Sequence, residues 1–175
     1  MESKHIIKLV LISSLLLVIL SGCPKVVWVS KQPPVPLDTL LSSKWGDSVD
    51  EVKRAIEKDG NQWFKDDTHQ SPFSLYASGR YLEHPALFSY FFTPKSKKLY
   101  RIDVTFSDLK VYEKAKSTLI QKYKNPSYSQ PDIDHWSWDD ISLLILQKDP
   151  THLQISYSSG PLLELNQKEG GLLGK

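Results

Sequence analysis

Apolar residues recur at helical spacing in two segments of the chain. In the first segment, Ser48 and Glu51 have the spacing of a capping box, a motif that marks the start of a helix. The apolar positions of each segment share one helical face: Val49, Val52, Ala55 and Ile56 in the first, and Leu109, Tyr112, Ala115, Leu119 and Tyr123 in the second. The spacing predicts helices over residues 48–58 and 108–123, the second capped by Ser107 or Asp108.

Other segments alternate between apolar and polar residues with a period of two. Such alternation over residues 100–106 is typical of a strand with one dry and one wet face. Similar patterns predict strands at 73–78, 87–92, 134–138, 141–147 and 152–158. The order αβββαβββ favours an α+β domain of two layers, an antiparallel sheet of about six strands with two helices on one face. Because each half has the same order of elements, the domain is expected to contain two similar halves.

The first 22 residues have the pattern of a secretory signal peptide. Lys4 and Lys8 precede an apolar run from Leu9 to Leu20, and small residues follow. A helix over that run is about 18 Å long, which is short of the roughly 30 Å hydrocarbon core of a bilayer. We therefore expect cleavage after residue 22 and no retained transmembrane helix.

The segment Leu20-Ser21-Gly22-Cys23 resembles the lipobox of bacterial lipoproteins. The resemblance implies that the Cys23 thiol receives a diacylglyceryl group, that a peptidase cuts between Gly22 and Cys23, and that the new N-terminus is acylated. Because two or three acyl chains hold a protein stably on a bilayer, it implies a lipid anchor at the cell membrane or outer membrane, on the extracytoplasmic side. The alternative is an ordinary secretory signal with a cysteine near its cleavage site.

The remaining chain divides into three parts. Residues 23–40 are rich in proline, which disfavours helix, and predict an extended tether of up to about 50 Å. Within it, residues 26–29 have two other interpretations, a contact with the lipid interface or an added strand of the sheet. Residues 41–160 are predicted as the single α+β domain. Residues 161–175 are a leucine-containing C-terminal tail, either frayed or packed on the domain or a partner.

Composition and charge exclude several functional classes. The 175 residues carry 22 Lys and Arg against 20 Asp and Glu, a net charge of +2 without a basic stripe. Nucleic acid is therefore not an expected partner, because its phosphates require a concentrated basic surface. The single cysteine excludes an internal disulfide and any multi-cysteine zinc or iron–sulfur site.

Ligand-type side chains are densest in residues 132–140, which contain Asp132, Asp134, His135, Asp139 and Asp140. The segment lacks the spacing of a calcium loop and the paired histidines of zinc sites, so we interpret it as a loop and a hairpin turn. The sequence also lacks a nucleophile elbow and a phosphate-binding loop. We expect no catalytic residue, no metal and no cofactor, and a metal site at 132–140 remains as an alternative.

The face of the sheet away from the helices is the predicted contact surface for a protein partner. It is expected to mix charge with a small apolar patch, as protein interfaces do. The alternative is a face that is only solvated. The candidate partner-binding residues are Arg101, Asp103, Leu144, Leu146, His152 and Gln154.

Three short motifs are similar to those of small envelope lipoproteins with β-lactamase-inhibitor-protein-like or SmpA/OmlA-like folds. They are Trp45-Gly46-x-Ser48-x-x-Glu51-Val52, Tyr123-x-x-Pro126 and a Trp-bearing hairpin. Several members of those families have Gly where this chain has Asn125. The resemblance implies an α+β fold and a non-catalytic role, and it transfers no functional residue.

Together these features predict an anchored extracytoplasmic lipoprotein that acts as an accessory or scaffold protein and binds a protein in the cell envelope. Two alternatives remain open. One is an anchored inhibitor or immunity factor against an envelope enzyme, and the other is a metal-dependent protein that uses residues 132–140.

Overall fold

The computed structural model of the chain describes residues 27–28 and 35–171. The predicted signal peptide and the Gly22-Cys23 cleavage and lipidation site lie outside these residues. The helices are α2 (Val49–Lys58), α3 (Val111–Tyr123) and α4 (Gly160–Lys168). The strands are β1 (Val27–Trp28), β2 (Gln62–Asp66), β3 (Ser74–Tyr81), β4 (His84–Phe92), β5 (Leu99–Phe106), β6 (Tyr128–Gln130), β7 (Ile133–Ser137), β8 (Leu143–Lys148) and β9 (Leu153–Ser158).

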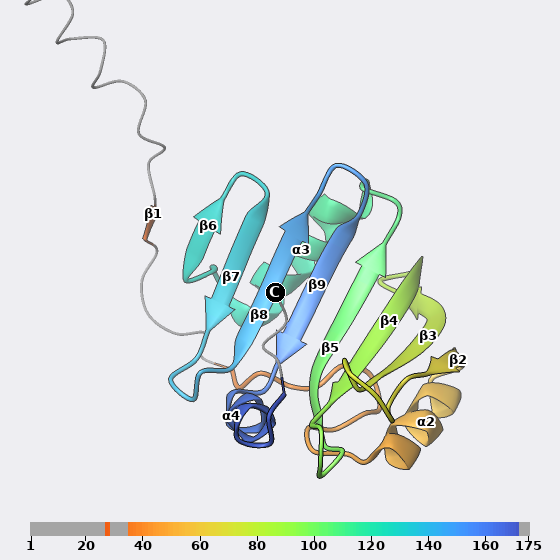
Figure 1. Ribbon diagram of the computed structural model, residues 1–175. Coiled ribbons are helices and arrows are strands. Elements are labelled where there is room, and N and C mark those ends of the chain that lie inside the picture. The colour runs from red at the N-terminus through yellow and green to blue at the C-terminus, as the bar shows by residue number, and fades with distance from the viewer. Residues whose placement is uncertain (1–26, 29–34, 172–175) are drawn as a thin grey trace, which may run out of the picture.

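All these strands belong to one antiparallel sheet, in the order β1-β6-β7-β8-β9-β5-β4-β3-β2 (Figure 1). Each half of the domain is a helix followed by a four-strand meander, α2 with β2–β5 and α3 with β6–β9. The last strands of the two halves, β5 and β9, pair antiparallel at the centre. The two halves are therefore arranged as if related by a two-fold axis between β5 and β9.

The predicted α+β class with an antiparallel sheet is confirmed, but the strand count and the element order were wrong. The described sheet has nine strands, eight of them longer than two residues, instead of about six. The two strands missed within the halves are β2 and β6, which lie near opposite edges of the sheet. Every residue of the edge strand β2 except the last is exposed, and none of the three residues of β6 is buried, so neither segment shows a clear apolar alternation.

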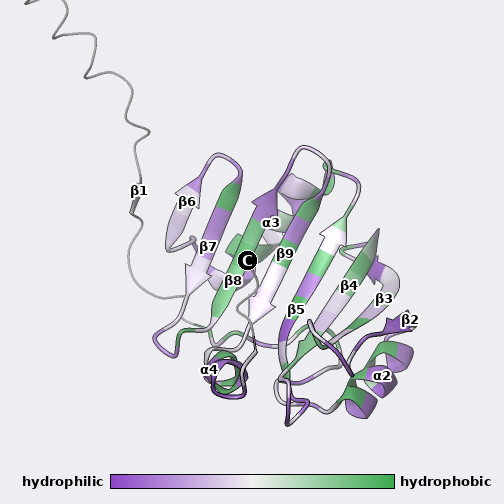
Figure 2. Ribbon diagram, viewed as in Figure 1, coloured by the Kyte–Doolittle hydropathy of each residue, from purple (hydrophilic) through white to green (hydrophobic). Residues whose placement is uncertain are grey.

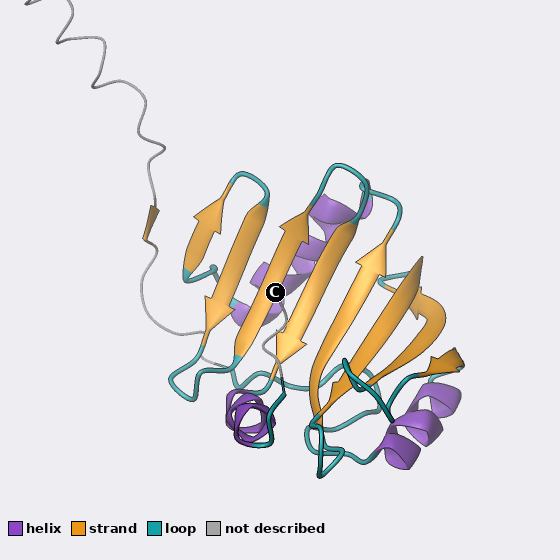
Figure 3. Cartoon of the chain, in the orientation of Figure 1, coloured by secondary structure: helices purple, strands orange, loops and turns teal. Residues whose placement is uncertain are grey.

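The hydrophobic core lies between one face of the sheet, here called the inner face, and the helices α2 and α3. Along β5 and β9, apolar residues that point to the inner face alternate with polar ones, which the colour bands of Figure 2 show. The inner residues Ile102, Val104 and Ile155 are fully buried in one cluster with Val52 of α2 and Leu119 of α3. Figure 3 shows α3 behind the sheet and α2 beside β2.

The two main helices begin in different ways. The capping box of α2 is confirmed, because Ser48 accepts from the backbone N–H of Glu51 and the Glu51 side chain accepts from the backbone N–H of Ser48. For α3, the predicted caps at 107 or 108 were wrong: the helix begins after Lys110, which makes no side-chain cap. Asp108 instead accepts from the backbone N–H of Lys110 at 2.9 Å and closes the turn before the helix.

Residues on both sides of the predicted domain pack onto it. On the N-terminal side, Leu37 and Leu40 belong to the buried core, and the indole of Trp45 donates to the Leu37 carbonyl at 3.1 Å. On the C-terminal side, residues 161–168 form most of α4. The Glu169 carboxylate after α4 accepts from the backbone N–H groups of Lys95 and Ser96 at 2.7 and 3.0 Å. The packed body therefore includes residues 35–40 and α4.

Candidate binding surface on the outer sheet face

The face of the sheet opposite α2 and α3, here called the outer face, carries a polar network at its centre. Arg101 donates from Nε and Nη2 to the two carboxylate oxygens of Asp103, each at 2.7 Å. Gln154 on the neighbouring strand donates to Asp103 at 3.1 Å and to the Ser156 hydroxyl at 2.9 Å. The placement of Arg101, Asp103 and Gln154 on one face agrees with the alternation in the sequence.

The charged side chains of this network are paired with each other and mostly buried. The network therefore stabilises the outer face and leaves little unpaired charge on it. The Asp103 side chain is 10% exposed and that of Arg101 is 25% exposed. The Arg101 guanidinium also lies 5.3 Å from the ring centre of Phe91, its cross-strand neighbour. Because Arg101 and Asp103 are already paired, their side chains would lose little conformational entropy when a ligand binds to this surface.

The placement of Leu144 and Leu146 on the outer face was wrong. Both side chains are fully buried in the inner core, paired across strands with Tyr157 and Ile155. The outer residues of β8 are instead Leu143 and Ile145, both half-buried. An alternating strand indicates two faces, but in a run of four apolar residues, Leu143–Leu146, the sequence alone does not distinguish the inner positions from the outer ones.

A hollow of about 290 Å³ lies at one end of the outer face. Strands β3, β4 and β5 form its floor and the β8–β9 turn forms one side; the lining residues include Ser78, Pro85, Leu87, Thr105, Ser107 and His152. Leu87 stands between the small side chains of Ser78 and Thr105 and is 52% exposed. Its neighbours are too short to cover it, so its apolar side chain stays exposed on the outer face.

His152, a predicted partner-binding residue, forms part of the rim of this hollow. Its Nε2 lies 3.1 Å from the Asp149 carboxylate, and its Nδ1 lies 3.1 Å from the Thr151 hydroxyl. These two contacts fix the orientation of the ring. The structure thus brings His152 to the same face as Gln154, Arg101 and Asp103, but at the end of the polar network.

The sequence predicted neither the hollow nor the exposure of Leu87. The sequence pattern predicts that Leu87 lies in a strand, but nothing in that pattern distinguishes it from a core leucine. Leu87 is exposed because the residues that flank it in the sheet, Ser78 and Thr105, are small. The sequence does not reveal that these residues are its neighbours, because this depends on strand pairing.

Residues 132–140 do not converge on one point. Asp134 points to the inner face and is fully buried, whereas His135 lies on the outer face, and Asp139 and Asp140 lie in the β7–β8 turn. Burial lowers the pKa of His135, whose Nε2 has no hydrogen-bond partner among the described residues. Within residues 35–171, no group of three or more His, Cys, Asp or Glu side chains could hold a metal ion.

Asp134 is instead the centre of an ion pair between β7 and α3, in which the carboxylate is fully buried and the Lys116 side chain is 29% exposed. Lys116 Nζ lies 2.8 Å from its Oδ2, and the hydroxyl of Ser129 donates to its Oδ1 at 2.5 Å. The hydroxyl of Tyr112 is a more distant donor at 3.4 Å. Although burial alone would lower the pKa of Lys116, its contact with Asp134 raises it. This arrangement joins helix and sheet.

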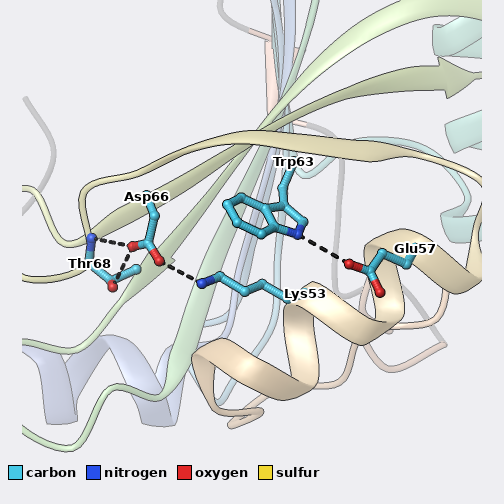
Figure 4. A network of polar contacts seen from close by, with 5 residues as sticks. All are labelled: Lys53, Glu57, Trp63, Asp66 and Thr68. Atoms are coloured by element: carbon cyan, nitrogen blue, oxygen red, sulfur yellow. Dashed lines mark hydrogen bonds and ion pairs between the residues drawn. The ribbon is translucent and has the colours of Figure 1, made fainter.

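A second polar network joins α2 to the edge strand β2 (Figure 4). Lys53 donates to the Asp66 carboxylate at 2.7 Å and lies 4.5 Å from the ring centre of Trp63. The Trp63 indole donates to Glu57 at 3.3 Å, and Thr68 donates to Asp66 through both its hydroxyl and its backbone N–H. Although burial alone would raise the pKa of Asp66, the hydrogen bonds from Lys53 and Thr68 lower it to about 2.

We expect the stability of the domain to fall as the pH drops from about 4 to about 2. The Asp66 pKa is lower in the folded state than its ordinary value near 3.9, so its contribution is complete above that value and is lost through the folded pKa. Urea unfolding at pH 4.5 and pH 2.5 measures the change. The Asp66→Asn variant should show a weaker dependence, and an equal dependence in both proteins would contradict the assignment.

No helix in the described part of the chain is long and apolar enough to cross a membrane.

Comparisons of the chain with protein-family models, with curated proteins and with solved structures found no match.

Proposed function

We propose that the mature protein is a lipoprotein anchored through Cys23 at the extracytoplasmic face of a cell membrane or outer membrane. Its domain binds a protein partner in the envelope, as an accessory or scaffold protein. The anchor is supported by the Leu20-Ser21-Gly22-Cys23 segment after an apolar run too short to span a bilayer.

The observation that supports binding is the outer face of the sheet. It combines the paired Arg101 and Asp103 with an apolar hollow around Leu87. Arginine is enriched among the residues that dominate protein interfaces, and the exposed Leu87 lies on the same face of the sheet as Arg101. We therefore expect an apolar side chain of the partner to fill the hollow. The margin of the same interface is expected to contact the polar network of Arg101 and Asp103.

The anchor is tested with a Cys23→Ala variant expressed in intact cells. We expect the variant to keep its folded domain, as judged by circular dichroism, and to leave the washed membrane fraction, where the native protein remains. Intact-mass measurement of the native protein should show cleavage before Cys23 and an added diacylglyceryl group. An unmodified thiol, or a variant retained in washed membranes, would show that the anchor is wrong.

Binding is tested in the same cells with a photo-crosslinking residue at Ser78, which is exposed beside Leu87. The matched control carries the residue at Ser117, exposed on α3. We expect an adduct with one envelope protein only from position 78, and a roughly tenfold lower yield with Leu87→Asp, equivalent to about 1.4 kcal/mol of binding energy. Ile141→Asp, at a residue of similar exposure, is the control substitution.

The identity of the crosslinked protein separates the functional classes. An adduct with an envelope assembly component supports the scaffold function, and a tight one-to-one complex with a hydrolase supports the anchored inhibitor. Equal labelling from positions 78 and 117, or a yield unaffected by Leu87→Asp, would refute the outer face as the binding surface.

A further inference from the structure

We infer that the domain is held close to the bilayer in one orientation, with the end that carries the β6–β7 and β8–β9 turns toward the lipid headgroups. The end that carries α4 and the β4–β5 and β7–β8 turns then faces away from the membrane. These two ends of the sheet are the upper and lower ends in Figure 1. The inference rests on the proposed anchor at Cys23 and adds to it the surface that meets the lipid.

The first observation is the direction of β1 along the edge of the sheet. β1 pairs antiparallel with β6, with Val27 opposite Ser129 and Trp28 opposite Tyr128. β6 runs from Tyr128 toward Gln130 and the β6–β7 turn, so β1 runs away from that turn. The backbone direction at Val27 therefore leads back toward the β6–β7 turn, and Cys23 precedes Val27 by four residues.

The second observation is the point at which the chain joins the core. The indole of Trp138, just after β7, donates to the carbonyl of Val35 at 2.8 Å. Because Trp138 directly follows β7, it lies at the end of that strand opposite the β6–β7 turn. Val35 is therefore held at the end of the sheet opposite the β6–β7 turn, which is the end toward which β1 runs.

The short connection between Cys23 and Val27 limits how far the domain can lie from the bilayer. Four peptide steps separate Cys23 from Val27, and even a fully extended chain of that length spans at most about 14 Å. Acyl chains on Cys23 would lie in the bilayer, so the edge of the sheet at Val27 stays within that distance of the headgroups. The pairing of β1 with β6 thus makes the working tether much shorter than the roughly 50 Å that residues 23–40 could span when extended.

The chemistry of the two ends fits this orientation. Exposed residues at the β6–β7 and β8–β9 turns are polar or proline: Gln130, Pro131, Asp132, Pro150 and Thr151. Such a surface can rest against headgroups without inserting into the hydrocarbon. Ile141 at the opposite end is 47% exposed and has a φ of 59°, a strained conformation for a β-branched residue. That apolar tip then faces away from the lipid.

The orientation also restricts the partner. The hollow around Leu87 includes Thr151 and His152 of the β8–β9 turn, so it lies at the end that faces the bilayer. A partner that fills it has to reach close to the headgroups. We therefore expect this partner to be a membrane-embedded or membrane-anchored protein.

The test measures energy transfer from a dye on the lipidated, full-length protein to an acceptor on lipid headgroups in reconstituted vesicles. Asp132→Cys and Ile141→Cys place the dye on exposed turns at opposite ends of the sheet, and lipidation consumes the thiol of Cys23, the only native cysteine. We expect the dye at position 132 to lie about 20 Å closer to the headgroups, because six residues of β8 span that length. A Val27→Pro variant, which disrupts the pairing with β6, should reduce this difference.

The outcomes separate the inference from its premise. If the protein floats with vesicles and its mass shows lipidated Cys23, but position 141 is as close to the lipid as position 132 or closer, the orientation is wrong and the anchor stands. If the protein does not float and Cys23 is unmodified, the anchor is wrong and the orientation is refuted with it.

Discussion

Replacing Trp136 by alanine is expected to lower the free energy of unfolding by about 3–5 kcal/mol. Trp136, at the centre of β7, is fully buried, and its indole donates to the carbonyl of Lys124 at 2.9 Å. The substitution creates a cavity and leaves that carbonyl without its donor. Because domains of this size are stable by about 5–15 kcal/mol, a large part of the total is lost. Urea unfolding followed by circular dichroism measures the change.

A Trp136→Phe variant is the matched control. It keeps most of the buried ring volume and loses only the hydrogen bond to Lys124, so its cost should be clearly smaller than that of Trp136→Ala. If both variants unfold at the same urea concentration as the native protein, Trp136 does not have the central packing role assigned to it.

Replacing Lys116 by methionine is expected to cost about 3–5 kcal/mol, because it leaves a fully buried carboxylate without its cation. Asp134 would keep hydroxyl donors from Ser129 and Tyr112, but these do not neutralise its charge. In the double variant Lys116→Met with Asp134→Leu, most of the stability should return, since a packed apolar pair replaces a buried ion pair with little loss. Thermal and urea unfolding of the three proteins measure this.

Lys114 on the same helix is the matched control for Lys116. It pairs with Glu83, whose side chain is 84% exposed, so Lys114→Met leaves a carboxylate in water and should not measurably change stability. Equal losses for Lys114→Met and Lys116→Met would contradict the role of burial. A double variant no more stable than Lys116→Met alone would contradict the proposed cost of the unpaired Asp134.

The sequence pattern predicted correctly those features that depend only on residues close together in the chain. The capping box at Ser48 and Glu51 and the apolar stripe of α2 depend on neighbours within one helical turn, and both are confirmed. The alternation in residues 100–106 likewise placed Arg101 and Asp103 together on the outer face. The lipobox segment, outside the described residues, stays a prediction.

Other features depended on strand pairing between distant residues. The four apolar residues 143–146 fit either face, and burial against Ile155 and Tyr157 decided that Leu144 and Leu146 point inward. The short strand β6 has no buried residue that could show a period. The hollow beside Leu87 exists only because small residues of two other strands flank it.

The sequence by itself determined α2, α3, most strands and the α+β class, because these depend on residue types at short spacing. Only the tertiary structure decided which side of each strand is buried, that the buried Asp134 pairs with Lys116 of α3, and that α4 and residues 35–40 pack onto the domain. The physical reason is that a periodic pattern specifies two faces, whereas contacts between residues distant in the sequence decide which face loses its water.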